Sequence, residues 1–136
     1  MIPGFRMQWP ITSELAVLRQ QVHAFGAGAG LSGQRLQDLV IAAHEAASNV
    51  LNHGGGYGTL VAWRDADGVS LDVIDAAGTL TEAHLDIEPD PHGGGGLLLV
   101  RALCDEVRVE RDPGGARLHL RMHTGPQHDR NEGQAA

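Results

Sequence analysis

The chain has 136 residues and a formal net charge of -7 at pH 7, with 42% hydrophobic and 20% charged residues. These values are ordinary for one folded domain with a sizeable core. Nucleic acid is not expected as a partner, because binding to phosphates needs a basic face. No apolar run is long enough for a membrane span, and the first residues have no apolar signal core. Cys104 is the single cysteine, so an internal disulfide is excluded and a cytoplasmic protein is expected.

The first predicted elements are a short strand and two helices. Residues 4–10 are expected to form an edge strand that ends at Pro10. Ser13 is placed to cap a helix over residues 14–25, which the run GAGAG ends. A longer helix is expected over residues 32–53, because apolar residues recur there at helical spacing. This apolar stripe consists of Leu36, Leu39, Val40, Ala43, Ala47 and Val50.

The second half of the chain is expected to form two hairpins, separated by a loop and a short helix. Asp67-Gly68 is a strong turn signal between two apolar runs within residues 58–75. Residues 76–96 lack regular periodicity, which predicts a loop, and the apolar run LLLVRALC predicts a short buried helix after it. A Pro-Gly-Gly turn joins two alternating runs within residues 105–123. Residues 124–136 have little to bury and are expected to be a disordered tail.

Helices and hairpins are therefore segregated along the chain and do not alternate. This order favours a two-layer α+β sandwich over a doubly wound parallel sheet. We expect one domain over residues 1–123, followed by the tail at 124–136.

The longer helix carries a polar pair, Glu45 and Asn49, one turn apart. On a helical wheel at about 100° per residue, Glu45 lies opposite the apolar stripe, with Asn49, Asp38, Ala42 and Asn52 on the same side. We therefore expect both side chains to point away from the face that packs on the sheet. An amide oxygen is a good ligand for Mg2+, and a neighbouring carboxylate can accept a proton from a hydroxyl group or water. An ordinary solvated helix face has the same pattern.

Two more candidate sites follow in the chain. Asp75 ends an apolar strand and precedes a small turn, where its carboxylate could accept a hydrogen bond from the exocyclic amine of adenine. A turn-starting Asp is the alternative. Gly93–Gly96 open the short helix that begins near Leu97. Backbone N–H groups at a helix start bind anions and glycines let a phosphate come close, although a flexible linker is also rich in glycine.

These elements occur in one order: Glu-x-x-x-Asn on a helix, Asp at a strand end, and a glycine-rich loop that leads into a helix. This order resembles the GHKL superfamily of ATP-binding domains, and more closely its short bacterial branch of anti-sigma factor serine kinases. AAHEAASNVLNHG is similar to the N box of that family and DVIDAAGTL to its first glycine box. GGGGLLLVRALCDEVRVER resembles its second glycine box with the helix and strand that follow, and GGARLHLRM its closing strand. The resemblance covers residues 12–123.

The resemblance implies a Bergerat-type fold, with helices on a mixed, mainly antiparallel sheet and ATP held between the helices and a loop. It implies that Glu45 is the general base, that Asn49 binds Mg2+, and that Asp75 reads adenine. Gly78 would lie in the turn beside the base. The residues that would contact the phosphates through their backbone are Gly94, Gly96 and Leu97.

The resemblance also implies a biological role. The chain would phosphorylate a serine on an anti-anti-sigma partner, sequester a sigma factor, and form a homodimer. It departs from the family pattern at Ala77 and Thr79, where glycines are common, and at Ala116, where a Thr is common. Residues 79–96 also carry four acidic side chains and no Lys or Arg. The alternatives are a catalytically inactive partner-binding module of the same fold and a nucleotide-binding fragment of a larger sensor kinase.

Other motifs are weaker. Residues 28–33 match G-x-G-x-x-G, but they follow a predicted helix. A dinucleotide-binding site requires this motif to follow a strand. His119 and His123 have the spacing H-x-x-x-H on an alternating strand, which separates their Cα atoms by roughly 13 Å and makes a shared metal ion unfavourable. No serine has a G-x-S-x-G setting.

Overall fold

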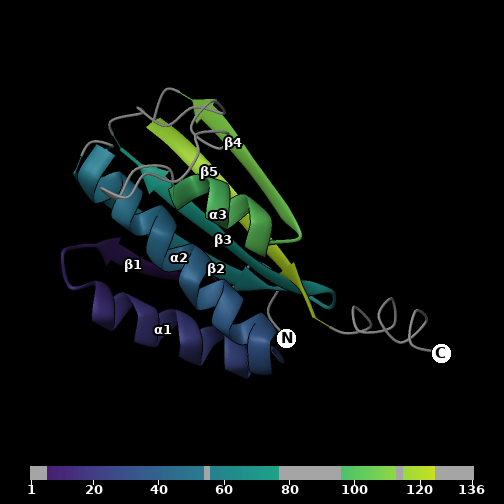
Figure 1. Ribbon diagram of the computed structural model, residues 1–136. Helices are drawn as coiled ribbons and strands as arrows, with labels where there is room; N and C mark the ends of the chain where they lie inside the picture. The colour runs from purple at the N-terminus through teal and green to yellow at the C-terminus, as the bar shows by residue number, and fades with distance from the viewer. Residues whose placement is uncertain (1–5, 54–55, 77–95, 113–114, 125–136) are drawn as a thin grey trace.

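The computed structural model describes residues 6–53, 56–76, 96–112 and 115–124. Within these ranges, three helices cover one face of a five-stranded sheet (Figure 1). The helices are α1 (Leu15–Gly28), α2 (Gly33–His53) and α3 (Gly96–Leu103). The strands are β1 (Met7–Ile11), β2 (Gly58–Arg64), β3 (Gly68–Asp75), β4 (Glu106–Asp112) and β5 (Gly115–His123). This arrangement confirms the predicted two-layer α+β fold.

The strand order is β1-β2-β3-β5-β4, and each described pairing is antiparallel. Hairpins produce this order directly, because β2 pairs with β3 and β4 with β5. The second hairpin then adds to the first through β3 and β5. This register puts the end of β3 beside the start of β5, which matters for the site described below.

Helix α2 lies along the middle of the sheet, between α1 and α3 (Figure 1). Its inner surface is rich in alanine, and small side chains let both helices and the sheet approach it closely. The residues of α2 with no exposed surface are Leu39, Ala42, Ala43, Ala46, Ala47 and Val50. The sheet contributes leucines and valines that alternate along the strands, such as Leu71 and Val73 on β3 and Leu118 and Leu120 on β5. The core therefore lies between α2 and the centre of the sheet.

One local prediction for α1 is wrong and another is confirmed. Ser13 does not cap the helix, since Glu14 is the N-cap residue and makes no side-chain capping bond. Instead, the Thr12 hydroxyl accepts the N–H of Glu14 at 3.1 Å. The helix ends within the predicted GAGAG run, at Gly28, slightly beyond the predicted last residue 25. A Cβ atom on Gly26 would lie 2.9 Å from side-chain atoms of Leu36 and Leu39, so the glycine lets α1 pack against α2.

The predicted Asp67-Gly68 turn joins β2 to β3. Asp65 Oδ1 accepts the backbone N–H groups of Asp67 at 2.8 Å and Gly68 at 3.0 Å. Arg121 donates to the same carboxylate at 2.9 Å and to the Ser70 hydroxyl at 2.8 Å. The hydrogen bond from Arg121, followed by that from the Asp67 N–H, lowers the pKa of Asp65 to about 2.

A second cluster of polar groups clamps the start of α2 to the ends of α3 and β5. Arg35 Nη2 donates to Asp105 Oδ2 at 2.5 Å and to the His123 carbonyl at 2.8 Å. The His123 N–H donates to Asp105 Oδ2 at 2.7 Å. Burial of the Asp105 carboxyl would raise its pKa, but the hydrogen bonds from Arg35 and His123 outweigh burial and lower it. We call Arg35, Asp105 and His123 the basal clamp.

These two carboxyl groups predict an acid-sensitive fold. Because each has a lower pKa in the folded chain than in the unfolded one, its contribution to stability is fully present above the ordinary value of 3.8. It is lost as the pH falls through the folded-state pKa. We expect the free energy of unfolding, measured with urea, to fall steadily below about pH 4. Asp105→Asn should be less stable at neutral pH and show a shallower decline in acid, and an unchanged decline would contradict this role.

Candidate functional site

The predicted site residues come from elements that meet at one end of the molecule. The C-terminal end of α2, the end of β3, and the starts of β5 and α3 lie together at the upper left of Figure 1. Asn49 lies in the last turns of α2, Asp75 is the last residue of β3, and Leu97 lies in the first turn of α3. These elements meet although Asn49 and Asp75 are 26 positions apart in the chain, and Asp75 and Leu97 are 22 positions apart.

Asp75 faces the helix layer and is fully buried. Along β3, side chains alternate between the two sheet faces, and Val69, Leu71 and Val73 pack in the core. Asp75 continues this core-facing row, so its carboxylate points to the side where α2 lies. The residues directly opposite it are Gly58 on β2 and Ala116 on β5. Neither neighbour carries a side chain larger than a methyl group, which leaves Asp75 as the polar group of this row.

Asn49 provides the decisive observation at this site. Its side chain is 8% exposed, and within the described part of the chain its Oδ1 atom accepts no hydrogen bond. An unsatisfied buried acceptor costs roughly 1–3 kcal/mol. Such a group in a folded protein calls for an explanation, and a ligand or ion that supplies the missing partner is one. A neutral amide oxygen is a suitable ligand for Mg2+.

Glu45 lies one turn before Asn49 and is partly exposed. The residues predicted on the same side of α2 as Glu45 differ in burial. Ala42 has no exposed surface and Asn49 is buried, and α1 and α3 both pack against α2 in addition to the sheet. Asn52 is exposed and donates to the Ser48 hydroxyl at 3.1 Å. The pair is therefore divided, with Asn49 turned inward and Glu45 accessible from solvent.

The glycine-rich segments are described only in part. Gly78 and Gly94 lie outside the described residues, as do Ala77, Thr79 and the acidic positions between Thr79 and the last of the four glycines. Gly96 is the first residue of α3, as predicted. Leu97 has no exposed surface and packs in the core. The backbone role of Leu97 therefore stays a prediction.

Sequence reasoning did not single out Gly58, which stands opposite Asp75 on β2. Nothing in the run YGTLVAW marks this glycine as different from an ordinary strand start. Its place beside Asp75 follows from the strand register, which depends on contacts between segments far apart in the chain.

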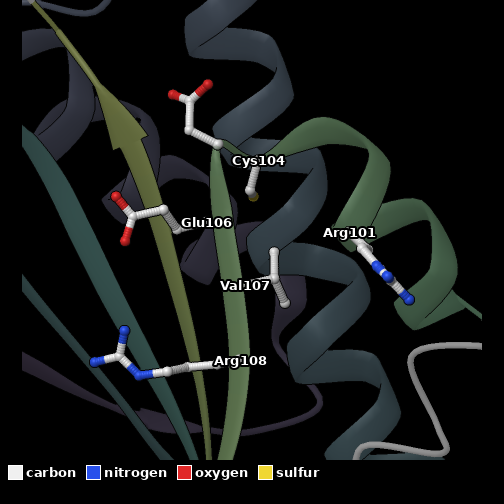
Figure 2. A pocket seen from close by; sticks show the side chains of 6 residues that line it. Arg101, Cys104, Glu106, Val107 and Arg108 are labelled. Carbon is white, nitrogen blue, oxygen red and sulfur yellow. The ribbon is translucent and has the colours of Figure 1, made fainter.

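Two cavities among the described residues lie away from these groups. One, of about 510 Å³, lies between β1 and α1 and is lined mainly by apolar side chains, including Trp9 and Phe25. The other, of about 470 Å³, lies beside α3 and the start of β4. In Figure 2 the charged ends of Arg101 and Arg108 point in different directions, so they do not form a common anion site. Burial raises the pKa of Cys104 there to about 12, which keeps its thiol protonated and unreactive.

A comparison with family models matches residues 11–122 to the histidine kinase-like ATPase domain. The chain belongs to this family. The match covers most of the chain and confirms the GHKL resemblance, and it supports ATP as the ligand of the site. A search of curated proteins gives no match. None of the described helices is long and apolar enough to cross a membrane.

The described residues fit a nucleotide with Mg2+. Asn49 Oδ1 is a buried oxygen ligand without a partner, as described above. Asp75 supplies a buried carboxylate that can accept a hydrogen bond from a base amine. The first turn of α3 supplies backbone N–H groups of the kind that bind phosphate. Together these groups would offer a bound nucleotide a hydrogen-bond acceptor, an oxygen ligand for the ion, and backbone donors for phosphate.

The Asn49 amide oxygen accepts no hydrogen bond from the described residues, which predicts that an apolar residue here would make the folded chain more stable. Asn49→Leu removes a buried acceptor and keeps the branched side-chain shape, so the free energy of unfolding without nucleotide should rise by about 1 kcal/mol. Urea denaturation without ATP and Mg2+ measures this change. Asn52→Leu on the exposed side of α2 is the control, with an expected change within about 0.5 kcal/mol. A loss of stability in Asn49→Leu would show that the amide oxygen is already satisfied within the folded chain.

Proposed function

We propose that the protein is an ATP-dependent serine kinase that phosphorylates an anti-anti-sigma partner and sequesters a sigma factor. The observation that carries the proposal is the buried Asn49 amide oxygen without a partner, at the same end of the fold as Asp75. Membership in the histidine kinase-like ATPase family supports nucleotide binding at this end. The short bacterial branch that the motifs resemble supports the serine acceptor and the two protein partners.

Each described group has a distinct role in the proposed reaction. Asp75 would accept a hydrogen bond from the adenine amine and so orient the base. Asn49 would hold Mg2+, which neutralises charge on the phosphates when it is bound. Backbone N–H groups of Gly94, Gly96 and Leu97 would contact the phosphates. Such contacts position the γ-phosphoryl group, and positioning is the main contribution of a protein to this chemistry.

Glu45 would act as the general base. As the serine oxygen of the partner forms a bond to the γ-phosphorus, the bond to the β-phosphate bridging oxygen breaks and ADP leaves. The serine proton passes to the Glu45 carboxylate. Because Glu45 is partly exposed while Asn49 is buried, a hydroxyl group on a docked protein can reach the carboxylate from outside. This division of the pair supports a macromolecular acceptor.

A catalytically inactive module that only binds its partner is the second candidate. Ala116, which is 1% exposed and lies opposite Asp75, offers no polar group to the base. With Ala77 and Thr79 in place of the common glycines, nucleotide contacts would be fewer than in the family pattern. In that case the fold would retain ATP as a structural ligand, or none, and act by holding a sigma factor.

Phosphoryl transfer to a purified anti-anti-sigma protein separates the two candidates. The wild-type chain with ATP and Mg2+ should place phosphate on one serine of the acceptor, detected by mass spectrometry. Glu45→Gln removes the base and should slow transfer by about 100-fold or more. An acceptor with that serine changed to alanine is the control and should receive no phosphate. A stable complex that forms without any transfer would favour the inactive module instead.

A further inference from the structure

Two glycines flank the end of β3 from opposite sides. Gly58 on β2 lies directly opposite Asp75 in the strand register. Gly115 begins β5, next to Ala116, which lies opposite Asp75 on the other side. The two neighbouring strands therefore both present a glycine to the segment that carries the Asp75 carboxylate.

Each glycine touches the backbone of that segment so closely that a methyl group would not fit. A Cβ atom on Gly58 would overlap the Ile74 carbonyl oxygen and approach Val50 Cγ1 at 3.4 Å. A Cβ atom on Gly115 would overlap the Asp75 carbonyl oxygen and lie 3.2 Å from that of Ala76. Gly115 also has a φ of +132°, which favours glycine. The close contacts thus involve the carbonyl groups immediately before and after the Asp75 Cα atom.

Close contacts with backbone are more restrictive than contacts with side chains. A flexible side chain can turn aside, whereas a carbonyl group in a paired strand moves only with the strand. An alanine at Gly58 or Gly115 would therefore shift the end of β3 relative to β2 or β5. Because the Asp75 side chain starts between the two affected carbonyl groups, its carboxylate would move as well. Hydrogen bonds tolerate such movement poorly, and a ligand site needs its groups held within about 0.5 Å.

We propose that Gly58 and Gly115 are positioning residues, which fix the Asp75 carboxylate for recognition of the exocyclic amine of the base. The proposal rests on the proposed function, because it takes Asp75 to be the base-reading group. It adds that nucleotide selectivity depends on two residues that do not themselves contact the base. The close approach of β2 and β5 to the end of β3 then holds the ligand-binding carboxylate in place and also stabilises the sheet.

A purely structural role is the competing explanation, and β3 contains a matched control. Gly68 lies at the opposite end of the same strand, where a Cβ atom would come within 2.5 Å of the Met122 carbonyl oxygen. An alanine at Gly68 therefore strains the sheet in a similar way. It does so beside the β2–β3 turn and away from Asp75.

The test compares ATP with purine riboside triphosphate, which lacks the exocyclic amine. The wild-type chain should bind ATP about tenfold more tightly, the preference expected for one hydrogen bond to a charged group. In Gly58→Ala and in Gly115→Ala this preference should fall towards one, because ATP affinity drops while affinity for the analogue stays close to the wild-type value. Gly68→Ala should keep the tenfold preference. Urea denaturation of each variant confirms that it is folded.

Every outcome bears on the proposal. If Gly58→Ala and Gly115→Ala lose the same factor of affinity for both nucleotides, the inference is overturned and the proposed function stands. A loss of the preference for ATP in Gly68→Ala would have the same consequence. The two variants are independent, so one that fails to fold leaves the other to decide. Failure of both to fold would assign the glycines to the fold alone. A wild-type chain that binds neither nucleotide would overturn the proposed function together with this inference.

Discussion

Helix α2 is packed on three sides, by the sheet, α1 and α3, and this packing determines where polar groups near the site can lie. Four alanines with no exposed surface, at positions 42, 43, 46 and 47, make the close packing possible. On the α1 flank, Arg19 Nη1 lies 3.0 Å from His44 Nδ1, and a guanidinium group only donates, so the histidine nitrogen accepts. Asn49 is also buried, and its amide oxygen has no such partner among the described residues. The narrow remaining side carries Glu45, which reaches solvent.

The hydrogen bonding of buried polar groups differs between the two ends of the molecule. At the basal clamp, the Asp105 carboxylate receives hydrogen bonds from Arg35 and from the His123 backbone, which offset the cost of its burial. At the other end, the Asn49 amide oxygen is a buried acceptor that receives no hydrogen bond from the described residues. The buried carboxylate of Asp75 ends an otherwise apolar row of β3. A protein stabilised at one end can tolerate the cost of a polar site at the other. We therefore assign stability mainly to the clamp and core, and ligand binding to the α2–β3 end.

Much of this organisation could be predicted from the sequence, because it depends on local patterns. Helical spacing identified α2, alternation identified the strands, and the Asp67-Gly68 signal located a turn. The position of Asp75 at a strand end was also predictable. A helical wheel takes α2 as packed on one face, whereas α3 also contacts this helix, so the burial of Ala42 was not predictable. That contact depends on the long-range arrangement of the chain, which no local pattern specifies.

The site was predictable in its residues but not in its surroundings. Residue type and spacing pointed to Glu45, Asn49 and Asp75, while the burial that separates Asn49 from Glu45 required the structure. Gly58 and Gly115 lie beside the end of β3 only because of the register across β2, β3 and β5. Register is set by the packing of whole strands, so it is visible only once the sheet is assembled.

Calorimetric titration of the protein with ATP and Mg2+ tests the central claim most directly, with Asp75→Asn compared against Asp72→Asn. Both residues are buried carboxylates of β3, but Asp72 lies on the other sheet face and pairs with His119 at 2.8 Å. We expect wild-type binding, a loss of about tenfold or more in Asp75→Asn, and retained affinity in Asp72→Asn. The absence of wild-type binding at millimolar ATP, or equal losses in both variants, would contradict a nucleotide site at the end of β3.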